Sequence, residues 1–343
     1  MKRRLLLLTN SVVIKTVFSL LSVFGILIAE VVCAASAPSL SSASRNSDRA
    51  KADFLDDRVR DLLSADKRPS VSPTFYYEQN FAPGYDSNPK LNDPAEYSSK
   101  FDFQSIFGVK GQLGALPIKY DIFGNWESLR FSRLSYWDQD NFRLKGKIAY
   151  TGFQKLYGIT TYASVQSKNF YERWFSPWFM RRDEIKVGIE KNWEFYSNDA
   201  ASHRDAKKRK MLDIEFGLAA TPRFERKKDG SSGLVDTNNS INYEASLDFV
   251  YVHSPEVRFI LANELGYRVF QTKLDDNGMI YTKRSLKFDS ELLIAWDFLA
   301  SVSPKALRPV LKAGVKYERA VDNTNDGYYR WTVGPIMSIS GRF

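Results

Sequence analysis

The stretch that decides the fold is the last one, residues 327–343, with the sequence GYYRWTVGPIMSISGRF. Counted back from Phe343 in steps of two, one set of positions is mostly apolar or aromatic, and the intervening set is mostly polar or small. A strand with this two-residue period presents one face to an apolar environment and the other to water. The stretch therefore predicts a strand that runs to residue 343, with aromatic side chains near both ends.

The same alternation recurs along the chain from Pro73 onward. The alternating segments lie at 74–81, 101–113, 118–127, 142–150, 157–166, 185–195, 212–218, 241–251, 257–269, 286–298, 311–318 and 329–343. A transmembrane β-strand needs roughly 9–11 residues, a length that most of these segments approach. We predict an all-β fold over 73–343, an antiparallel transmembrane β-barrel of about 12 strands. The connection 197–210 is long enough to hide a missed strand, so barrels of roughly 10 or 14 strands remain alternatives.

A soluble β-sandwich is the competing fold, because its strands also alternate where one face packs on a core. Three features favour the membrane. The predicted strands exceed ordinary sandwich strands in length, the polar face is charged on nearly every strand, and aromatic residues lie at strand ends on the apolar face. These aromatic residues are Trp193, Trp296, Phe298, Trp331 and Phe343. Aromatic residues at such positions are typical of the interfacial girdles of membrane barrels.

Composition excludes two other classes of protein. Mean hydropathy is −0.36, and after residue 35 no apolar run approaches the roughly 20 residues that a membrane helix needs. A helical membrane protein is therefore excluded. The formal net charge of +9 is spread along the chain, whereas a nucleic-acid footprint is clustered. We expect no nucleic-acid partner.

The N-terminus has the three parts of an export signal. Residues 1–4 are basic, residues 17–29 are mostly apolar, and residues 33–37 offer small-residue cleavage sites. We expect a signal peptide over 1–35, cut after Ala34 or Ala35; a retained membrane anchor is the alternative. Val32 before Cys33 argues against a lipoprotein. Because Cys33 is the only cysteine, we expect no disulfide and no cysteine-bound metal in the mature chain.

Residues 36–72 form a separate segment, Ser- and Ala-rich at first and then charged. Five apolar side chains fall within one half of a helical wheel: Phe54, Leu55, Val59, Leu62 and Leu63. We predict a short amphipathic helix in the periplasm, acting as a plug, a partner-binding arm or a tether.

Two stretches resemble known membrane barrels. The strand ending at Phe343 resembles the closing strand of Gram-negative outer-membrane β-barrels, although Gly341 occupies an outward position that is usually apolar there. The stretch Tyr85-Asp86-Ser87-Asn88 resembles the end of the first strand in poorly characterised porin-like barrel families and in barrels that assist surface-lipoprotein export. The resemblance implies an outer-membrane location in a Gram-negative bacterium and contact with lipid and lipopolysaccharide. It also implies that the barrel-assembly machinery reads Phe343.

No catalytic constellation emerges from the sequence. The two histidines, His203 and His253, fall in predicted connections rather than beside a nucleophile. The loop 322–327 resembles a calcium loop only faintly, because Val333 stands where the closing Glu belongs. We expect no enzymatic activity, no cofactor and no bound metal.

The polar faces of the predicted strands suggest two charged walls of a lumen. The basic wall comprises Arg143, Lys145 and Lys147, and the acidic wall comprises Glu190, Glu194, Asp213, Glu215, Glu244 and Asp248. Separate walls would create a transverse field that orients polar solutes. Alternatively, the opposite charges pair and fill a narrow interior.

The loop predicted at 169–182 is aromatic and basic. Its candidate constriction residues are Arg173, Trp174, Trp178, Arg181 and Arg182. The loop either folds inward or binds a partner at the surface. We expect a porin-like channel for small polar or charged solutes. The alternative is a barrel without a conducting pore that serves surface-protein or polysaccharide export, assembly or surface interaction. The sequence leaves the solute and the oligomeric state open.

Overall fold

The structure is a computed structural model. It describes residues 73–88, 97–133, 138–153, 157–172, 178–197, 209–228, 235–254, 256–274, 280–297, 308–323 and 327–342. The expected signal peptide, the segment 36–72, His203 and Phe343 lie outside these residues. No helix in the described part of the chain is long and apolar enough to cross a membrane.

The described residues form twelve long strands. They are β1 (Thr74–Asp86), β2 (Ser98–Gln112), β3 (Ile118–Phe131), β4 (Gln139–Tyr150), β5 (Ile159–Tyr171), β6 (Trp178–Ser197), β7 (Arg209–Lys228), β9 (Ser240–Val252), β10 (Val257–Phe270), β13 (Arg284–Trp296), β14 (Arg308–Asp322) and β15 (Gly327–Arg342). Three short strands extend hairpins beyond the wall: β8 (Val235–Thr237), β11 (Lys273–Leu274) and β12 (Ile280–Tyr281).

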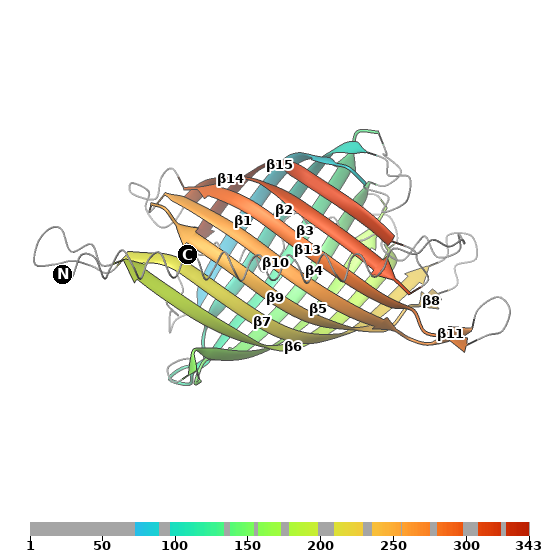
Figure 1. The fold of residues 1–343 in the computed structure, drawn as a ribbon, viewed down its shortest axis with the longest axis horizontal. Helices are drawn as coiled ribbons and strands as arrows, with labels where there is room; N and C mark the ends of the chain where they lie inside the picture. The colour runs from blue at the N-terminus through green and yellow to red at the C-terminus, as the bar shows by residue number, and fades with distance from the viewer. Residues whose placement is uncertain are drawn as a thin grey trace, which may run out of the picture. The chain divides into compact units, whose positions relative to one another are not determined.

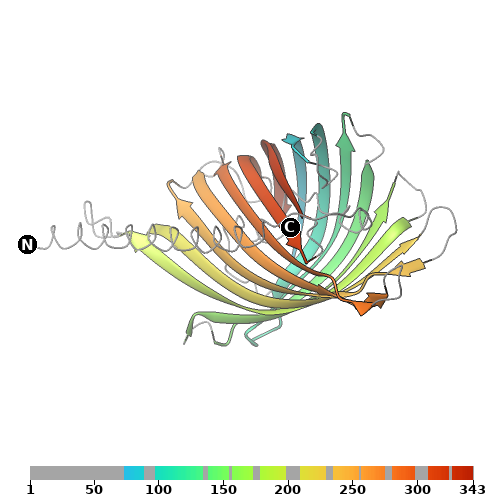
Figure 2. The same cartoon turned by 45° about the vertical axis from the view of Figure 1, so that its right-hand side comes forward.

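The twelve long strands close into a ring of antiparallel neighbours (Figure 1, Figure 2). The first strand, β1, pairs with the last, β15, and we call this junction the seam. The additional pairing of β6 with β7 completes the ring. The prediction of an all-β antiparallel barrel of about 12 strands is confirmed. Because β6 and β7 pair directly, no barrel strand lies between them, and the long connection 197–210 does not alter the count.

Side chains alternate across the wall as the sequence predicts. On β15, Tyr329, Trp331 and Val333 are exposed on the outside, whereas Arg330 and Thr332 are buried on the inside. Exposed tryptophans occur towards both ends of the barrel: Trp193 and Trp296 near the rim where β1 begins and β15 ends, and Trp331 near the opposite rim. An apolar outer surface with aromatic residues near both rims matches the hydrocarbon core and interfaces of a bilayer.

Several strands are longer than the sequence patterns indicate. β1 continues to Asp86, so the turn-rich stretch after Phe81 belongs partly to the strand. β5 extends to Tyr171 and β6 begins at Trp178, so the expected loop over 169–182 is wrong in extent. The hydropathy alternation is lost there because Arg181 and Asp183 place charges on the outer face, whereas Phe170 and Met180 are apolar and buried on the inner face.

Glycines allow the backbones of β1 and β15 to approach each other closely at the seam. A Cβ at Gly334 would lie 2.3 Å from the backbone oxygen of Pro83 and 2.7 Å from the Cα of Gly84. The two strands therefore approach each other at a point where no side chain fits.

We predict that Gly334→Ala destabilises the barrel by about 1–3 kcal/mol, because the methyl group forces the seam apart. Gly124→Ala on β3 is the matched control, since its Cβ would meet nothing within 4 Å. The measurement is the temperature at which the refolded barrel loses its distinct gel mobility when unboiled. Equal transition temperatures for the two variants would contradict a close-packed seam.

Candidate functional site

The inner wall of the barrel is lined by buried polar and charged side chains from most of the long strands. Along β2, for example, Lys100, Asp102 and Gln104 are all buried and point to the same side. Alternation sets this arrangement: every second side chain of a closed barrel must enter the interior, where charged groups meet each other. The lumen is therefore the place where this chain concentrates its ionisable groups.

Five buried cations gather on the wall formed by β4 to β10, and we call them the basic ladder. They are Arg143, Lys168, Arg182, Arg223 and Arg268. The first three stand directly opposite one another across neighbouring strands, Arg143 beside Lys168 and Lys168 beside Arg182. Like charges in cross-strand contact are unfavourable, so this row requires compensation from its surroundings.

Three glutamates provide part of that compensation. Lys168 Nζ lies 3.1 Å from Glu127 Oε2, and Arg182 donates from Nε and from a terminal nitrogen to Glu225 Oε2 at 3.0 and 2.7 Å. Arg223 Nε lies 2.5 Å from Glu184 Oε1. Glu127 also accepts a 3.0 Å hydrogen bond from the Asn141 side chain.

Aromatic rings hold the long cationic side chains in place. The Phe170 ring lies 5.1 Å from Lys168 Nζ and 5.3 Å from Arg182 Cζ, measured to the ring centroid. Phe170 is itself fully buried against Met180 and Phe179. Arg143 lies over Phe123 at 5.4 Å and Arg268 over Phe270 at 5.6 Å. These cation–π contacts add attraction without neutralising the positive charge.

The structure places the charged residues predicted for the lumen on inward strand positions. Arg143, Lys145 and Lys147 lie on β4, Glu190 and Glu194 on β6, Asp213 and Glu215 on β7, and Glu244 and Asp248 on β9. Two ion pairs involve the predicted acidic residues. One joins an acidic residue to the predicted basic wall, and the other joins an acidic residue to a lysine outside that wall. Lys147 Nζ lies 3.5 Å from Glu190 Oε1, and Lys186 forms an ion pair with Glu244.

The residues predicted for a constriction loop have a different setting. Trp178, Arg181 and Arg182 belong to β6 rather than to a loop, because the β5–β6 ladder continues to the pair Tyr171 and Trp178. Arg182 faces the lumen, whereas Arg181 faces outward and lies 3.1 Å from Asp183. Arg173 and Trp174 lie outside the described residues.

The stretch Tyr85-Asp86-Ser87-Asn88 forms a clasp across the seam, and we call these four residues the seam clasp. Asp86 is fully buried and accepts bonds from Arg330 Nε at 3.0 and 2.9 Å, with a further contact from a terminal guanidinium nitrogen. Trp331 N donates to Ser87 Oγ at 2.7 Å, and Asn88 Nδ2 donates to the Tyr329 carbonyl at 3.0 Å. The clasp joins β1 to β15 where the barrel closes.

Sequence reasoning missed most of the basic ladder. Lys168 falls between the predicted strand 157–166 and the predicted loop 169–182, and Arg223 and Arg268 were not distinguished from other polar positions. Extending the alternation would have found Lys168, which shares a face with Ser164 and Gln166. The neighbour relationships need the register between strands, which no local pattern contains.

A closed antiparallel barrel with an apolar outer surface and a charged interior is a transmembrane β-barrel, the architecture of bacterial outer-membrane proteins. No protein-family model matches the chain, and no curated protein matches it. Similar solved structures include an outer membrane channel from Pseudomonas putida F1, with 10% identity and a TM-score of 0.48 over 82% of this chain and 98% of that one.

Two further neighbours are also 10% identical to this chain. The translocator domain of the autotransporter NalP from Neisseria meningitidis has a TM-score of 0.39 and covers 84% of this chain and 93% of its own. The NanC porin has a TM-score of 0.38 and covers 77% of this chain and 98% of its own. The likeness is one of architecture only.

Proposed function

We propose that this chain is a porin-like channel that passes small polar or charged solutes across the outer membrane of a Gram-negative bacterium. One observation carries the proposal: the wall is apolar outside and lined with ionisable groups inside. Charged groups inside a membrane are costly and face a water-filled path or a specific partner. An aqueous path along these side chains would give polar solutes a route that the bilayer denies them.

The basic ladder further supports a preference for anions. Arg143, Lys168 and Arg182 stand in one row on β4, β5 and β6, where Lys168 pairs with Glu127 and Arg182 with Glu225. Rings of basic side chains favour anions in narrow pores, because the low dielectric wall strengthens the attraction. We therefore propose small anionic solutes as the preferred cargo.

We predict stepwise single-channel conductance when the refolded protein is added to a planar lipid bilayer. Under a potassium chloride gradient, the reversal potential should have the sign of chloride preference, because the basic ladder attracts anions. Protein unfolded by boiling and detergent alone serve as controls and should produce no steps. A folded barrel that carries no current at any voltage or salt concentration would overturn the channel proposal and favour a role in export, assembly or surface interaction.

A further inference from the structure

Two prolines face each other across the seam. Strands β1 and β15 pair in register on both sides of a break in their ladder at residues 82–84. Counting from the pair of Phe81 and Met337 places Pro83 opposite Pro335 inside this break. The break therefore lies where neither strand has a backbone N–H group to donate.

Both prolines occupy positions whose backbone groups point toward the opposite strand. Beyond the break, Ser87 N donates to the Trp331 carbonyl at 2.9 Å. Hydrogen-bonded pairs of an antiparallel ladder recur at every second residue, so Pro83 and Pro335 form one of them. Because proline has no N–H group, both hydrogen bonds of this pair are missing. Water cannot replace them in hydrocarbon, so the seam is weakly paired at this level.

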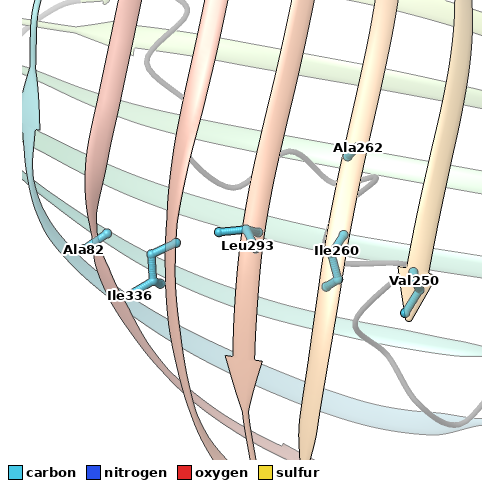
Figure 3. Close-up of a cluster of buried hydrophobic side chains, with 6 residues drawn as sticks. All are labelled: Ala82, Val250, Ile260, Ala262, Leu293 and Ile336. Carbon is cyan, nitrogen blue, oxygen red and sulfur yellow. The ribbon is translucent and has the colours of Figure 1, made fainter. Parts of the chain in front are cut away.

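The inward side chains do not strengthen the seam at this level. The four inward positions of β1 and β15 there are small or apolar: Ala82, Gly84, Gly334 and Ile336. Figure 3 shows Ala82 and Ile336 side by side, and both belong to one buried apolar cluster. Polar contacts flank this level. The seam clasp lies toward one rim, and Glu78 lies 3.2 Å from Ser338 Oγ and 3.8 Å from Lys312 Nζ toward the other.

A second break, between β6 and β7, provides a comparison. There the register places Pro222 opposite Ile185, so a single donor is missing. Beside that break, Arg223 Nε lies 2.5 Å from Glu184 Oε1, and this ion pair joins the two strands. At the seam both donors are missing, and no ion pair can join β1 to β15 at the level of the prolines.

The seam is closed in this structure by backbone contact. A Cβ at Gly84 would lie 2.8 Å from the carbonyl oxygen of Val333. Van der Waals contact of this kind is weak per atom pair and has no directional requirement. The two strands can therefore separate here at a lower cost than at a hydrogen-bonded pair.

We propose that the seam is a lateral gate, which opens between β1 and β15 at Pro83 and Pro335 and admits the acyl chain of an amphiphilic molecule. Such a gate connects the lumen with the hydrocarbon core of the bilayer. The proposal requires a closed barrel and does not depend on ion conduction.

The two sides of the seam suit an amphiphile. On the outer face, Phe81 and Met337 are exposed beside the prolines. On the inner face, Lys100 and Asp102 of β2 are buried next to Gly84 and Ala82 of β1. A molecule with an apolar chain and a polar head would meet an apolar surface outside and charged groups inside.

Labelling from the bilayer tests the gate in the full chain carrying Cys33→Ser. Ala82→Cys is the test site. Ala262→Cys is the matched control, because it is also a buried inward alanine and its strand, β10, has unbroken ladders with β9 and β13. The reagent is a phospholipid whose acyl chain ends in a maleimide, incorporated in the vesicles that hold the barrel. We expect Ala82→Cys to react at least about tenfold faster, since two hydrogen bonds are missing at the seam. Equal rates would overturn the proposal.

Restoring the donors tests whether the prolines cause the opening. Pro83→Val and Pro335→Val are added together to Ala82→Cys, and the labelling rate should fall to that of Ala262→Cys. Pro222→Val, added instead, should leave the rate of Ala82→Cys unchanged, because it restores a donor in another ladder. A rate that stays high after both seam prolines are replaced would contradict the gate.

Hydrogen exchange of the unmodified protein covers the case in which the cysteine variants do not fold. In lipid vesicles, the amides next to Pro83 and Pro335 should exchange at least about tenfold faster than those at the middle of β10 and β13. Mass spectrometry of peptides from the four strands measures the rates. Equal protection of the two strand pairs would show that the seam does not open.

Discussion

Asp86→Ala is expected to lower the free energy of unfolding of the barrel by about 3–5 kcal/mol, the largest single effect that we predict. Asp86 is fully buried, and it is the carboxylate that receives the Arg330 guanidinium through both oxygens. Its removal leaves Arg330 charged and buried without its bidentate partner. Equilibrium unfolding in urea from lipid vesicles measures the change.

Two comparisons isolate the buried pair as the cause. Asp183→Ala breaks the ion pair between Arg181 and Asp183, whose side chains are 45% and 31% exposed, respectively. Because this pair is solvent-exposed, the loss in the free energy of unfolding should be less than about 1 kcal/mol. The double variant Asp86→Ala with Arg330→Ala should recover part of the lost stability, because no lone buried charge remains. If Asp86→Ala and Asp183→Ala cost the same, the seam clasp does not hold the barrel closed.

Arg182→Gln is expected to shift the ion selectivity of the channel toward cations by roughly five- to tenfold in permeability ratio. The substitution removes one member of the basic ladder. It also frees Glu225, which receives two hydrogen bonds from Arg182. Both changes make the lumen more negative at the same place. The reversal potential across a bilayer under a salt gradient reports the ratio.

The adjacent residue supplies a matched control. Arg181→Gln removes the same charge from the same strand, but Arg181 faces outward. Its selectivity should equal that of the unmodified protein. Equal shifts in the two variants would mean that the effect arises from net charge rather than from the lumen. No shift in Arg182→Gln would place the basic ladder away from the ion path.

The face of each strand was predictable from the sequence. Counting from Phe343 in steps of two assigns Arg330, Thr332 and Ser338 to the interior, and all three are buried there. The same count assigns Trp331 and Met337 to the outside, where both are exposed. This succeeds because the two-residue period is a property of the extended backbone itself and needs no partner strand.

This reasoning fails where charged residues occupy successive positions of a strand. Between Asn169 and Arg182 the hydropathy pattern loses contrast, and a strand was mistaken for part of a loop. The stretch Tyr85-Asp86-Ser87-Asn88 was noticed only through resemblance, and its role as the seam clasp was not predicted. Asp86 and Arg330 are 244 positions apart, so their pairing has no local signature.

The sequence by itself determined that this chain forms membrane-length strands with one apolar and one polar face, and within the alternating segments it determined which residues belong to each face. Only the tertiary structure decided which inward residues meet. Arg143, Lys168 and Arg182 form a row because three strands pair in one register, and the buried Val250, Ile260 and Leu293 adjoin because β9, β10 and β13 do the same. Register is fixed when the ring closes, since every strand must then satisfy the hydrogen bonds of two neighbours at once.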